Sequence, residues 1–428
     1  MSGDPCDLTA TAARAAIAAG TLSATDLARS CLDRIKAREP EIHAWAALDP
    51  DLWLAAAEAS DAAGNPGRLG GLPLGVKDLA ATRAWPTSCG SPIYDGVHAP
   101  FDAAVVALTR IAGGVIAGKT VTTEFAAFHA GPTRNPHNPD HTPGGSSSGS
   151  AAAVAAGMVP FAVGTQTAGS VVRPAAYCGV FGYKPSFGVI DATGIKPFAP
   201  SLDTVGVLAR GVADCRLFAE AVSGADLTSP EKRRPTRIGW CRSPAWSGVS
   251  EAMRHAFETD LPQRMREARF TPVEVDLPPV FDEAMEAQKA IMTWEAARAL
   301  SFELETHADL LSPGLRARLE AGAAMDYAAV SEAYGVRDAA IASFPMVLEG
   351  YDVAALITPS APGIAPRFAD GTGSPDFNRL WTLLRGPCVQ IPGLSCAETG
   401  LPLGVQVVAP LGHDARLLAI AERLAEAL

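Results

Sequence analysis

The hydrophobic positions of this chain form short apolar runs bounded by glycine, and these runs alternate with stretches of helical spacing. Runs such as Leu72–Val76, Val115–Ala117 and Phe161–Val163 are typical of strands that are buried on both faces. Helices are predicted between them, over 101–111, 123–128 and 149–157. This alternation predicts an α/β protein whose central β-sheet is largely buried and covered by helices on both faces.

The pattern changes along the chain and divides it into four parts. Before residue 66 it is helical, and a cap at Ser23 precedes apolar residues at helical spacing. After residue 227 charge increases, and long amphipathic helices are predicted, for example over 250–268 and 281–308. We predict a single domain over residues 1–428, made of N-terminal helices (1–65), a core (66–227), a helical excursion (228–345) and a C-terminal return to the core sheet (346–428).

Composition and charge narrow the function classes. The hydrophobic content of 48% is ample for a core, and the net charge of −11 argues against nucleic acid as a partner. The longest apolar run, 151–163, is too short to cross a bilayer, so no membrane partner is expected. The N-terminus lacks the pattern of a secretory signal, so we expect a cytoplasmic protein. The eight cysteines include no C-x-x-C pair and are expected to be buried thiols.

Two glycine-rich serine loops and a lysine carry the candidate chemistry. The loops are Thr142-Pro-Gly-Gly-Ser-Ser-Ser-Gly-Ser150 and Gly164-Thr-Gln-Thr-Ala-Gly-Ser170, and Lys77 follows the buried run at 72–76. Serine and lysine together can perform acyl transfer without histidine, provided that the lysine is neutral. Glycine beside the serines allows backbone amides to approach a reacting carbonyl group.

Two other motifs compete with this interpretation. The segment 113–120 fits the phosphate-loop string G-x-x-x-x-G-K-[ST], but a predicted strand lies inside the supposed loop. The segment 145–149 fits G-x-S-x-G, which would make Ser147 the nucleophile. That motif must directly follow a strand, whereas turn-forming residues 138–143 precede it here. Flexible linkers are disfavoured because both serine loops lie between strongly apolar segments.

At these residues the chain resembles the amidase signature family. The lysine block of the family resembles Gly71–Asp78, its glycine-serine block resembles Gly144–Ser150, and its nucleophile block resembles Gly164–Ser170. The resemblance continues through 182–185, 201–206 and 400–406, and it covers most of the chain outside the excursion. It implies the family's fold, a mixed and largely buried central sheet covered by helices on both faces.

The resemblance also implies a Ser–cis-Ser–Lys triad. Ser170 maps as the nucleophile, Ser146 as the bridging serine with a cis peptide bond, and Lys77 as the base. The backbone amides of Thr167, Ala168, Gly169 and Ser170 map as the oxyanion hole. Burial of Lys77 among apolar residues would favour the neutral amine that a base requires.

The nucleophile block departs from many members of the family, including the amidotransferase component that acts on glutamyl-tRNA. Gln166, Ala168 and Val172 replace the usual Asp, Gly and Arg, and the arginine comes one position later, at Arg173. This arrangement resembles malonamidase and related small-amide hydrolases, in which an arginine holds a substrate carboxylate. An alternative of equal weight is that Arg173 only stabilises the conformation of its own loop. Gln166 and Ser147 are further candidates for contact with the substrate.

We therefore expect a stand-alone hydrolase that cleaves a small-molecule amide through an acyl-enzyme. A carbamate, urethane or ester hydrolase with the same triad is the alternative within this class. An amidotransferase A-type subunit that acts only in a complex is the alternative outside it. The resemblance implies no metal and no organic cofactor, and a homodimer is a family-level expectation. The excursion and the loop at 359–378 are predicted to shape the substrate pocket.

Overall fold

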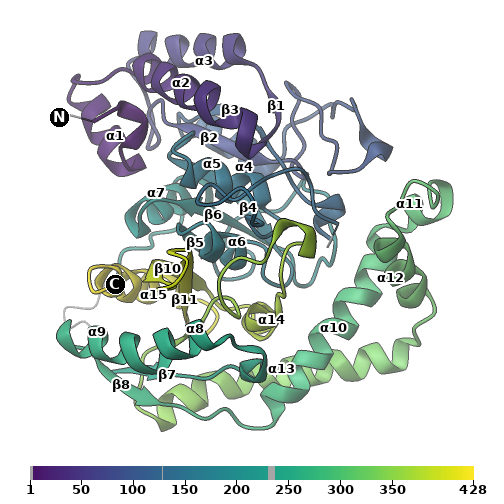
Figure 1. Cartoon of the computed structure of the whole chain (residues 1–428). Coiled ribbons are helices and arrows are strands. Elements are labelled where there is room, and N and C mark those ends of the chain that lie inside the picture. The colour runs from purple at the N-terminus through teal and green to yellow at the C-terminus, as the bar shows by residue number, and fades with distance from the viewer. Residues whose placement is uncertain (1–2, 128, 230–236) are drawn as a thin grey trace.

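A computed structural model describes residues 3–127, 129–229 and 237–428 of the chain (Figure 1). Within these ranges one sheet of eleven strands crosses the molecule in the order β1-β3-β2-β4-β6-β5-β10-β11-β9-β7-β8. Strand β2 runs parallel to β3 and β4, and β7 runs parallel to β8 and β9, whereas the other neighbours are antiparallel. The strands are β1 Trp45–Leu48, β2 Pro73–Lys77, β3 Val115–Thr120, β4 Phe161–Gln166, β5 Phe181–Lys184, β6 Thr204–Ala209, β7 Arg237–Trp240, β8 Thr271–Glu274, β9 Leu356–Pro359, β10 Cys388–Ser395 and β11 Pro402–Val408.

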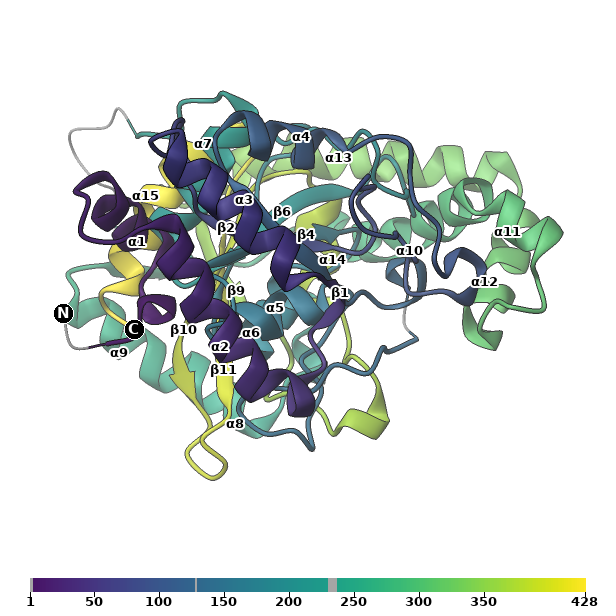
Figure 2. The same cartoon turned by 90° about the horizontal axis from the view of Figure 1, so that it is seen from above.

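Helices cover both faces of this sheet, as the sequence predicts. Helices α5 and α6 pack on one face, and α4, α7 and α15 pack on the other (Figure 2). Every residue of β2, β3, β4 and β6 is buried as a result, which matches their continuous apolar runs. The helices are α1 Ala10–Ala18, α2 Ala24–Ile42, α3 Pro50–Ala62, α4 Ala104–Ile111, α5 Ser148–Ala155, α6 Val172–Tyr177, α7 Val212–Ser223, α8 Glu251–His255, α9 Leu261–Glu267, α10 Val280–Ala299, α11 Ser301–Thr306, α12 Pro313–Ala323, α13 Tyr327–Gly350, α14 Asp376–Leu383 and α15 Asp414–Ala425.

The excursion at 228–345 is less helical than the sequence predicts. Its residues 230–236 lie outside the described part of the chain, and β7 follows them directly. Strands β7 and β8 form one edge of the central sheet, joined to it through β9. The predicted helix at 250–268 is α8 and α9 with one π-helical turn between them. Both strands are only four residues long, too short for a clear alternating pattern, which is why helical spacing dominated the prediction.

Two shorter predictions also need correction. The N-terminal stretch contains β1, which pairs with β3 and lies between helices α2 and α3 along the chain. The helix predicted over 123–128 is a single 3₁₀ turn, Glu124–Ala126, because Phe125 adopts a left-handed backbone with φ of 45°. Its last predicted residue, Phe128, lies outside the described residues.

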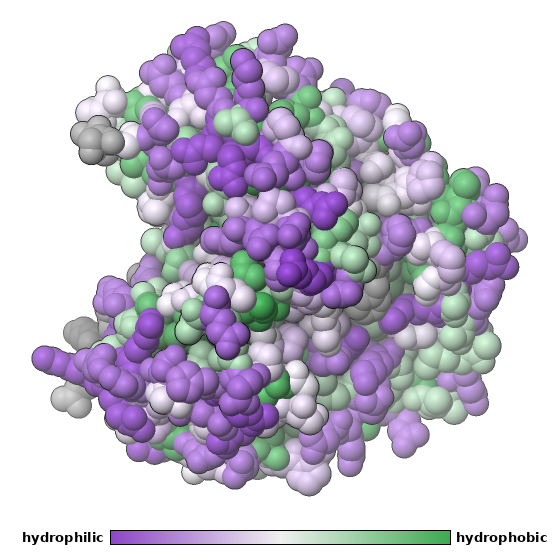
Figure 3. Space-filling view, in the orientation of Figure 1, coloured by the Kyte–Doolittle hydropathy of each residue, from purple (hydrophilic) through white to green (hydrophobic). Residues whose placement is uncertain are grey.

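Helices α10 to α13 form an arm that projects from one side of the sheet (Figures 1 and 2). The long helices α10 and α13 pack against each other, and α11 lies near the tip of the arm. Figure 3 shows hydrophobic surface over this end of the arm, where Phe302 and Leu310 are exposed. No helix in the described ranges is both long enough and apolar enough to span a bilayer.

Candidate active site

Lys77 is the last residue of β2, and its side chain is fully buried. Its Nζ lies 2.7 Å from Ser146 Oγ and 2.8 Å from Thr165 Oγ1, both within hydrogen-bond distance. Burial lowers the pKa of Lys77 well below its usual value, the nearby charge of Asp203 opposes this, and the charge of Arg173 adds to it. The amine is thus held among hydroxyl groups in an environment that disfavours its charged form.

Ser146 lies in the loop that precedes α5, and the Gly145–Ser146 peptide bond is cis, as the resemblance implied. The carbonyl group of Ser146 accepts a hydrogen bond from the backbone amide of Thr123. The neighbouring carbonyl group of Gly145 accepts one from Arg173 Nη2 at 2.6 Å. These contacts hold the Ser146 hydroxyl against Lys77.

The loop from Thr167 to Ser170 has every carbonyl group occupied by a protein donor. Gln288 Nε2 donates to Thr167 O at 3.1 Å, and Thr382 Oγ1 donates to Ala168 O at 2.6 Å. Backbone amides donate to the other two carbonyls, Arg173 N to Gly169 O at 2.8 Å and Ser147 N to Ser170 O at 3.3 Å. Among the described residues, no acceptor is found for the four amide N–H groups of the same loop. Such a set of free donors is suited to bind an oxyanion.

The structure brings the predicted serine and lysine residues into one site, but one hydrogen bond of the expected relay is missing. Ser147 N bonds to Ser170 O, so the two serine loops are in direct contact. No hydrogen bond between Ser146 Oγ and Ser170 Oγ is present in the part of the chain that the structure describes. The Ser170 side chain instead lines a small cavity of about 20 Å³, room for about one water molecule.

Arg173, from α6, is buried beside this cavity. Its Nη2 donates to Gly145 O, but Nε and Nη1 are buried without a partner among the described residues. No carboxylate of the described chain forms an ion pair with it. Burial lowers the pKa of Arg173 to about 10, so the guanidinium is still charged at neutral pH. A buried cation with two free N–H groups is suited to bind an anion that the protein does not supply.

The geometry does not support substrate contacts for Gln166 and Ser147. Gln166 Oε1 accepts from the amides of Val171 and Val172, and its Nε2 donates to Thr382 Oγ1. Ser147 Oγ lies 3.3 Å from both the backbone N and the backbone O of Thr165, with the side chain fully buried. Both side chains therefore hold the loops and do not line the cavity at Ser170.

Several residues of the site were missed by the sequence analysis. Gln288 comes from α10, and its Oε1 accepts from Arg379 Nη1 at 2.7 Å while its Nε2 binds the Thr167 loop. Asn378 on α14 packs against Gly169, where an added Cβ would lie 2.4 Å from Asn378 Oδ1. Gln288 is the one amide side chain among the buried positions of α10, and this signal could have marked it. Nothing in the sequence indicates that its partner is the Thr167 loop.

Asp203 is the second missed group. Its carboxylate accepts hydrogen bonds from Thr167 Oγ1 at 2.5 Å and from the amides of Phe198 and Ala199. Burial raises the pKa of Asp203 to about 6, although these hydrogen bonds lower it. Asp203 thus connects the loop that carries Ser170 to the electrostatic environment of Lys77.

The structure also bears on the competing motifs. Strand β3 passes through the segment 113–120, so this segment is not a phosphate loop. All eight cysteines are buried and free, as predicted. Burial raises the pKa of the Cys178 thiol, which agrees with a packing role.

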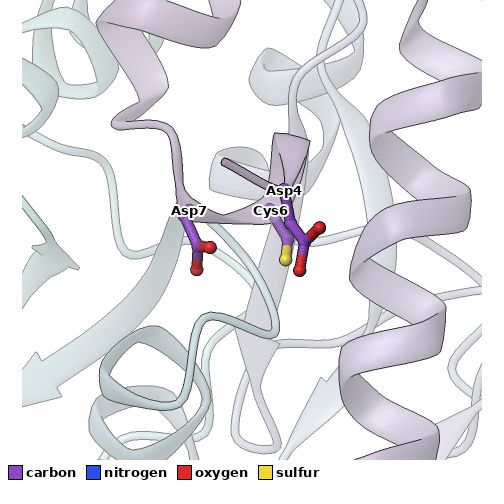
Figure 4. Close-up of side chains that lie close together, drawn as sticks. All are labelled: Asp4, Cys6 and Asp7. Carbon is purple, nitrogen blue, oxygen red and sulfur yellow. The ribbon is translucent and has the colours of Figure 1, made fainter. Parts of the chain in front are cut away.

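A group of potential metal ligands lies near the N-terminus (Figure 4). The ligand atoms of Asp4, Cys6 and Asp7 lie within 4.8 Å of one another. Arg34 Nη2 lies 3.6 Å from the carboxylate of Asp4 and 3.0 Å from that of Asp7. The arginine already supplies the positive charge that these carboxylates attract, so the group is explained without an ion.

Comparison with known proteins identifies the class. Residues 26–418 match the model of the family described as Amidase, and the chain belongs to this family. It is therefore a hydrolase of the amidase signature family, with the mixed α/β sheet of amidase structures.

Particular relatives differ in what their names say they do. The chain is 34% identical to the A-type subunit of the glutamyl-tRNA(Gln) amidotransferase of Acidothermus cellulolyticus, over 97% of this chain and 93% of that protein. A match of 45% identity to the corresponding protein of Chloroflexus aurantiacus covers only 42% of this chain and 39% of the relative. Among solved structures, one of an amidase matches with a TM-score of 0.90 and 30% identity, covering 98% of this chain and 100% of the other. The peptide amidase of Stenotrophomonas maltophilia matches with a TM-score of 0.83 and 28% identity, covering 98% of this chain and 96% of the other.

Proposed function

We propose that this enzyme hydrolyses an amide through an acyl-enzyme on Ser170, with Ser146 and Lys77 as the proton relay. The observation that carries the proposal is the 2.7 Å contact between Lys77 Nζ and Ser146 Oγ in a buried setting. A serine hydroxyl is a weak nucleophile until a base removes its proton, and a lysine can do so only when neutral. Burial of Lys77 favours that neutral form.

The proposed cycle begins when Ser170 Oγ attacks the substrate carbonyl carbon and a C–O bond forms. The proton of Ser170 passes to Ser146 while the proton of Ser146 passes to Lys77. The oxyanion accepts hydrogen bonds from the free amides of residues 167–170, each worth about 3–4 kcal/mol in such sites. The C–N bond then breaks as the relay returns the proton to the leaving nitrogen. Water attacks the ester by the same relay, and a carboxylate and free Ser170 are released.

Arg173 supports a narrower substrate class within this proposal. Its two unpartnered N–H groups lie beside the cavity of Ser170 and lack a carboxylate partner among the described residues. We assign them to a carboxylate on the acyl side of the substrate, as in the malonamidase-like arrangement. Substitution of Arg173 by Lys then raises KM strongly for acidic amides and little for neutral ones, because lysine lacks the planar guanidinium and its additional N–H donors. An equal rise for both classes would assign Arg173 to loop structure alone.

The test of the reaction is a panel of amides, anilides, carbamates and esters. We expect Ser170→Ala to lower turnover at least about 10³-fold for every substrate that the wild type cleaves. Ser147→Ala is the matched control, because the hydroxyl group of this adjacent-loop serine bonds only to the backbone of Thr165, and the kcat of the variant should stay within about 10-fold. Phenylmethylsulfonyl fluoride should label Ser170 alone. Full turnover by Ser170→Ala would overturn the proposal, and the preferred substrate separates amidase from carbamate or ester hydrolase.

A second candidate is an amidotransferase A-type subunit that acts only within a complex. The 34% identity to a protein of that kind over nearly the whole chain favours it. The replacements at Gln166, Ala168 and Val172 and the acidic net charge argue for the stand-alone enzyme. A purified chain that gives no acyl-enzyme burst with an activated ester, but becomes active with a partner protein, would favour this second candidate.

A further inference from the structure

A cavity of about 460 Å³ adjoins the candidate active site, and its size is that of a small-molecule site. The segment 187–205, which connects β5 to β6 and includes the first two residues of β6, supplies most of its wall. No described residue of the excursion, which the sequence analysis expected to shape the substrate pocket, lines this cavity, although Met292 of the excursion lines the small cavity at Ser170. The large apolar residues of the wall are Leu79, Phe187, Ile190, Ile195 and Phe198.

This cavity is adjacent to the reactive groups. Ala126, Thr167 and Phe198 line both it and the small cavity that contains Ser170. Thr165 also lines the large cavity, and its Oγ1 lies 2.8 Å from Lys77 Nζ. The large cavity therefore lies on the side of the base, whereas Arg173 lines only the small one.

We propose that the large cavity binds the leaving amine of the substrate and that this amine carries an apolar group. The inference rests on the proposed function, since the leaving nitrogen must receive its proton from Ser146 and Lys77 and so must face the relay. The acyl group, with its carboxylate at Arg173, lies on the other side of Ser170, where the small cavity has room for only about one water molecule and must widen to admit it.

Of the three charged groups of the wall, two are partnered by the protein and the third is exposed to solvent, which leaves apolar surface to select the ligand. Lys196 Nζ pairs with Glu303 Oε1 at 2.5 Å, and Tyr94 OH donates to the same oxygen. The carboxylate of Asp203 is occupied by three protein donors. Asp191 is exposed at the rim. A cyclic or branched alkylamine fits such a wall better than ammonia or a second charged group.

A neighbouring cavity of about 420 Å³ shares part of the same wall. It shares Leu79, Ile195 and Lys196 with the first cavity and is lined further by Val97 and Phe101. Ile195 lies between the two cavities, so a larger side chain at this position reduces the space in both.

The experiment compares N-methyl and N-cyclohexyl amides of the best acid found in the substrate panel. The two leaving amines have similar basicity and differ in apolar size, so the chemistry of bond cleavage is matched. For the wild type we expect kcat/KM at least about 10-fold higher for the N-cyclohexyl amide. Ile195→Trp should bring this ratio close to one while changing the N-methyl amide less than about 3-fold.

Two further variants keep the result interpretable. Ile111→Trp places the same residue at an exposed position of α4 and should leave both substrates unchanged. If Ile195→Trp does not fold, as judged by its melting temperature, Ile195→Ala should lower the ratio by removing apolar contact. A wild-type ratio near one, or a ratio that survives Ile195→Trp, overturns the inference. Sensitivity of Ile195→Trp to the size of the acyl group instead of the amine also overturns it. Failure of the wild type to cleave any amide overturns the proposed function, and the inference with it.

Discussion

The serine loops of the core and the helical arm of α10 to α13 differ in how their polar groups are partnered. In the core, Lys77 and the Lys119–Asp78 ion pair are buried, and their contacts are 2.7–2.8 Å long. In the arm, pairs such as Arg316–Glu320 are exposed, and Met346 is 70% exposed. Electrostatic interactions are much stronger in the buried setting, so the core can shift pKa values and stabilise charge. The arm reaches the chemistry through the inner face of α10, where Gln288 bonds to the Thr167 loop.

The largest effect is expected at the buried amine. Lys77→Met retains an unbranched side chain but removes the proposed base, and kcat should fall roughly 10³–10⁴-fold. In the wild type, burial lowers the pKa of Lys77, and the neutral amine increases as pH rises through that pKa. The kcat/KM of the wild type should therefore rise with pH on the acidic side of the profile, and steady-state kinetics on the best amide measures both effects. Undiminished turnover by Lys77→Met would show that the buried amine is not needed for catalysis, and the contrast between core and arm would then have no functional consequence.

The buried ion pair tests whether the core depends on its charges for stability. Lys119→Met leaves Asp78 buried without its cation, and the free energy of unfolding should fall by about 3–5 kcal/mol. Arg316→Met, the control in the arm, breaks an exposed pair and should cost less than about 0.5 kcal/mol. Urea denaturation of the three proteins gives the values. Equal losses of unfolding free energy in the two variants would show that an ion pair in the core matters no more for stability than an exposed pair in the arm.

The contact between the arm and the core gives an intermediate effect. Gln288→Leu leaves Thr167 O and Arg379 Nη1 without a partner, so the loop loses one of its four carbonyl contacts. We expect kcat to fall about 10–100-fold, equivalent to about 1–3 kcal/mol for an unsatisfied buried group. Gln263→Leu, on the exposed face of α9, should leave kcat unchanged. A change in KM alone would place Gln288 in substrate binding and not in support of the loop.

The smallest effect concerns Asp203 and is visible mainly in the pH profile. The pKa of Asp203 is about 6, so above this pH its carboxylate is charged and raises the pKa of Lys77. Asp203→Asn removes that charge, the pKa of Lys77 falls further, and the acidic limb of kcat/KM moves to lower pH. Asp191→Asn is the matched control, because Asp191 is exposed in the loop that precedes Asp203. A shift to higher pH, or equal shifts in both variants, would contradict this assignment.

The sequence by itself determined the strands that carry the chemistry and the order of the reactive loops. Continuous apolar runs place Lys77 at the end of a buried strand, and glycine spacing marks the two serine loops. These features depend on neighbours along the chain, so a local pattern is enough to predict them. Local patterns misjudged β7 and β8, whose four residues each are stabilised by pairing with distant strands.

Only the tertiary structure decided which side chains hold the Thr167–Ser170 loop. Gln288 and Thr382 bond to Thr167 and Ala168 across 121 and 214 positions of the chain. The same distant contacts occupy Gln166, whereas Arg173 keeps N–H groups that no described residue accepts, so of these two predicted substrate contacts only Arg173 is left with donors for a ligand. Hydrogen bonds of this kind depend on how helices pack on the sheet, and that packing has no signature in the spacing of residues along the chain.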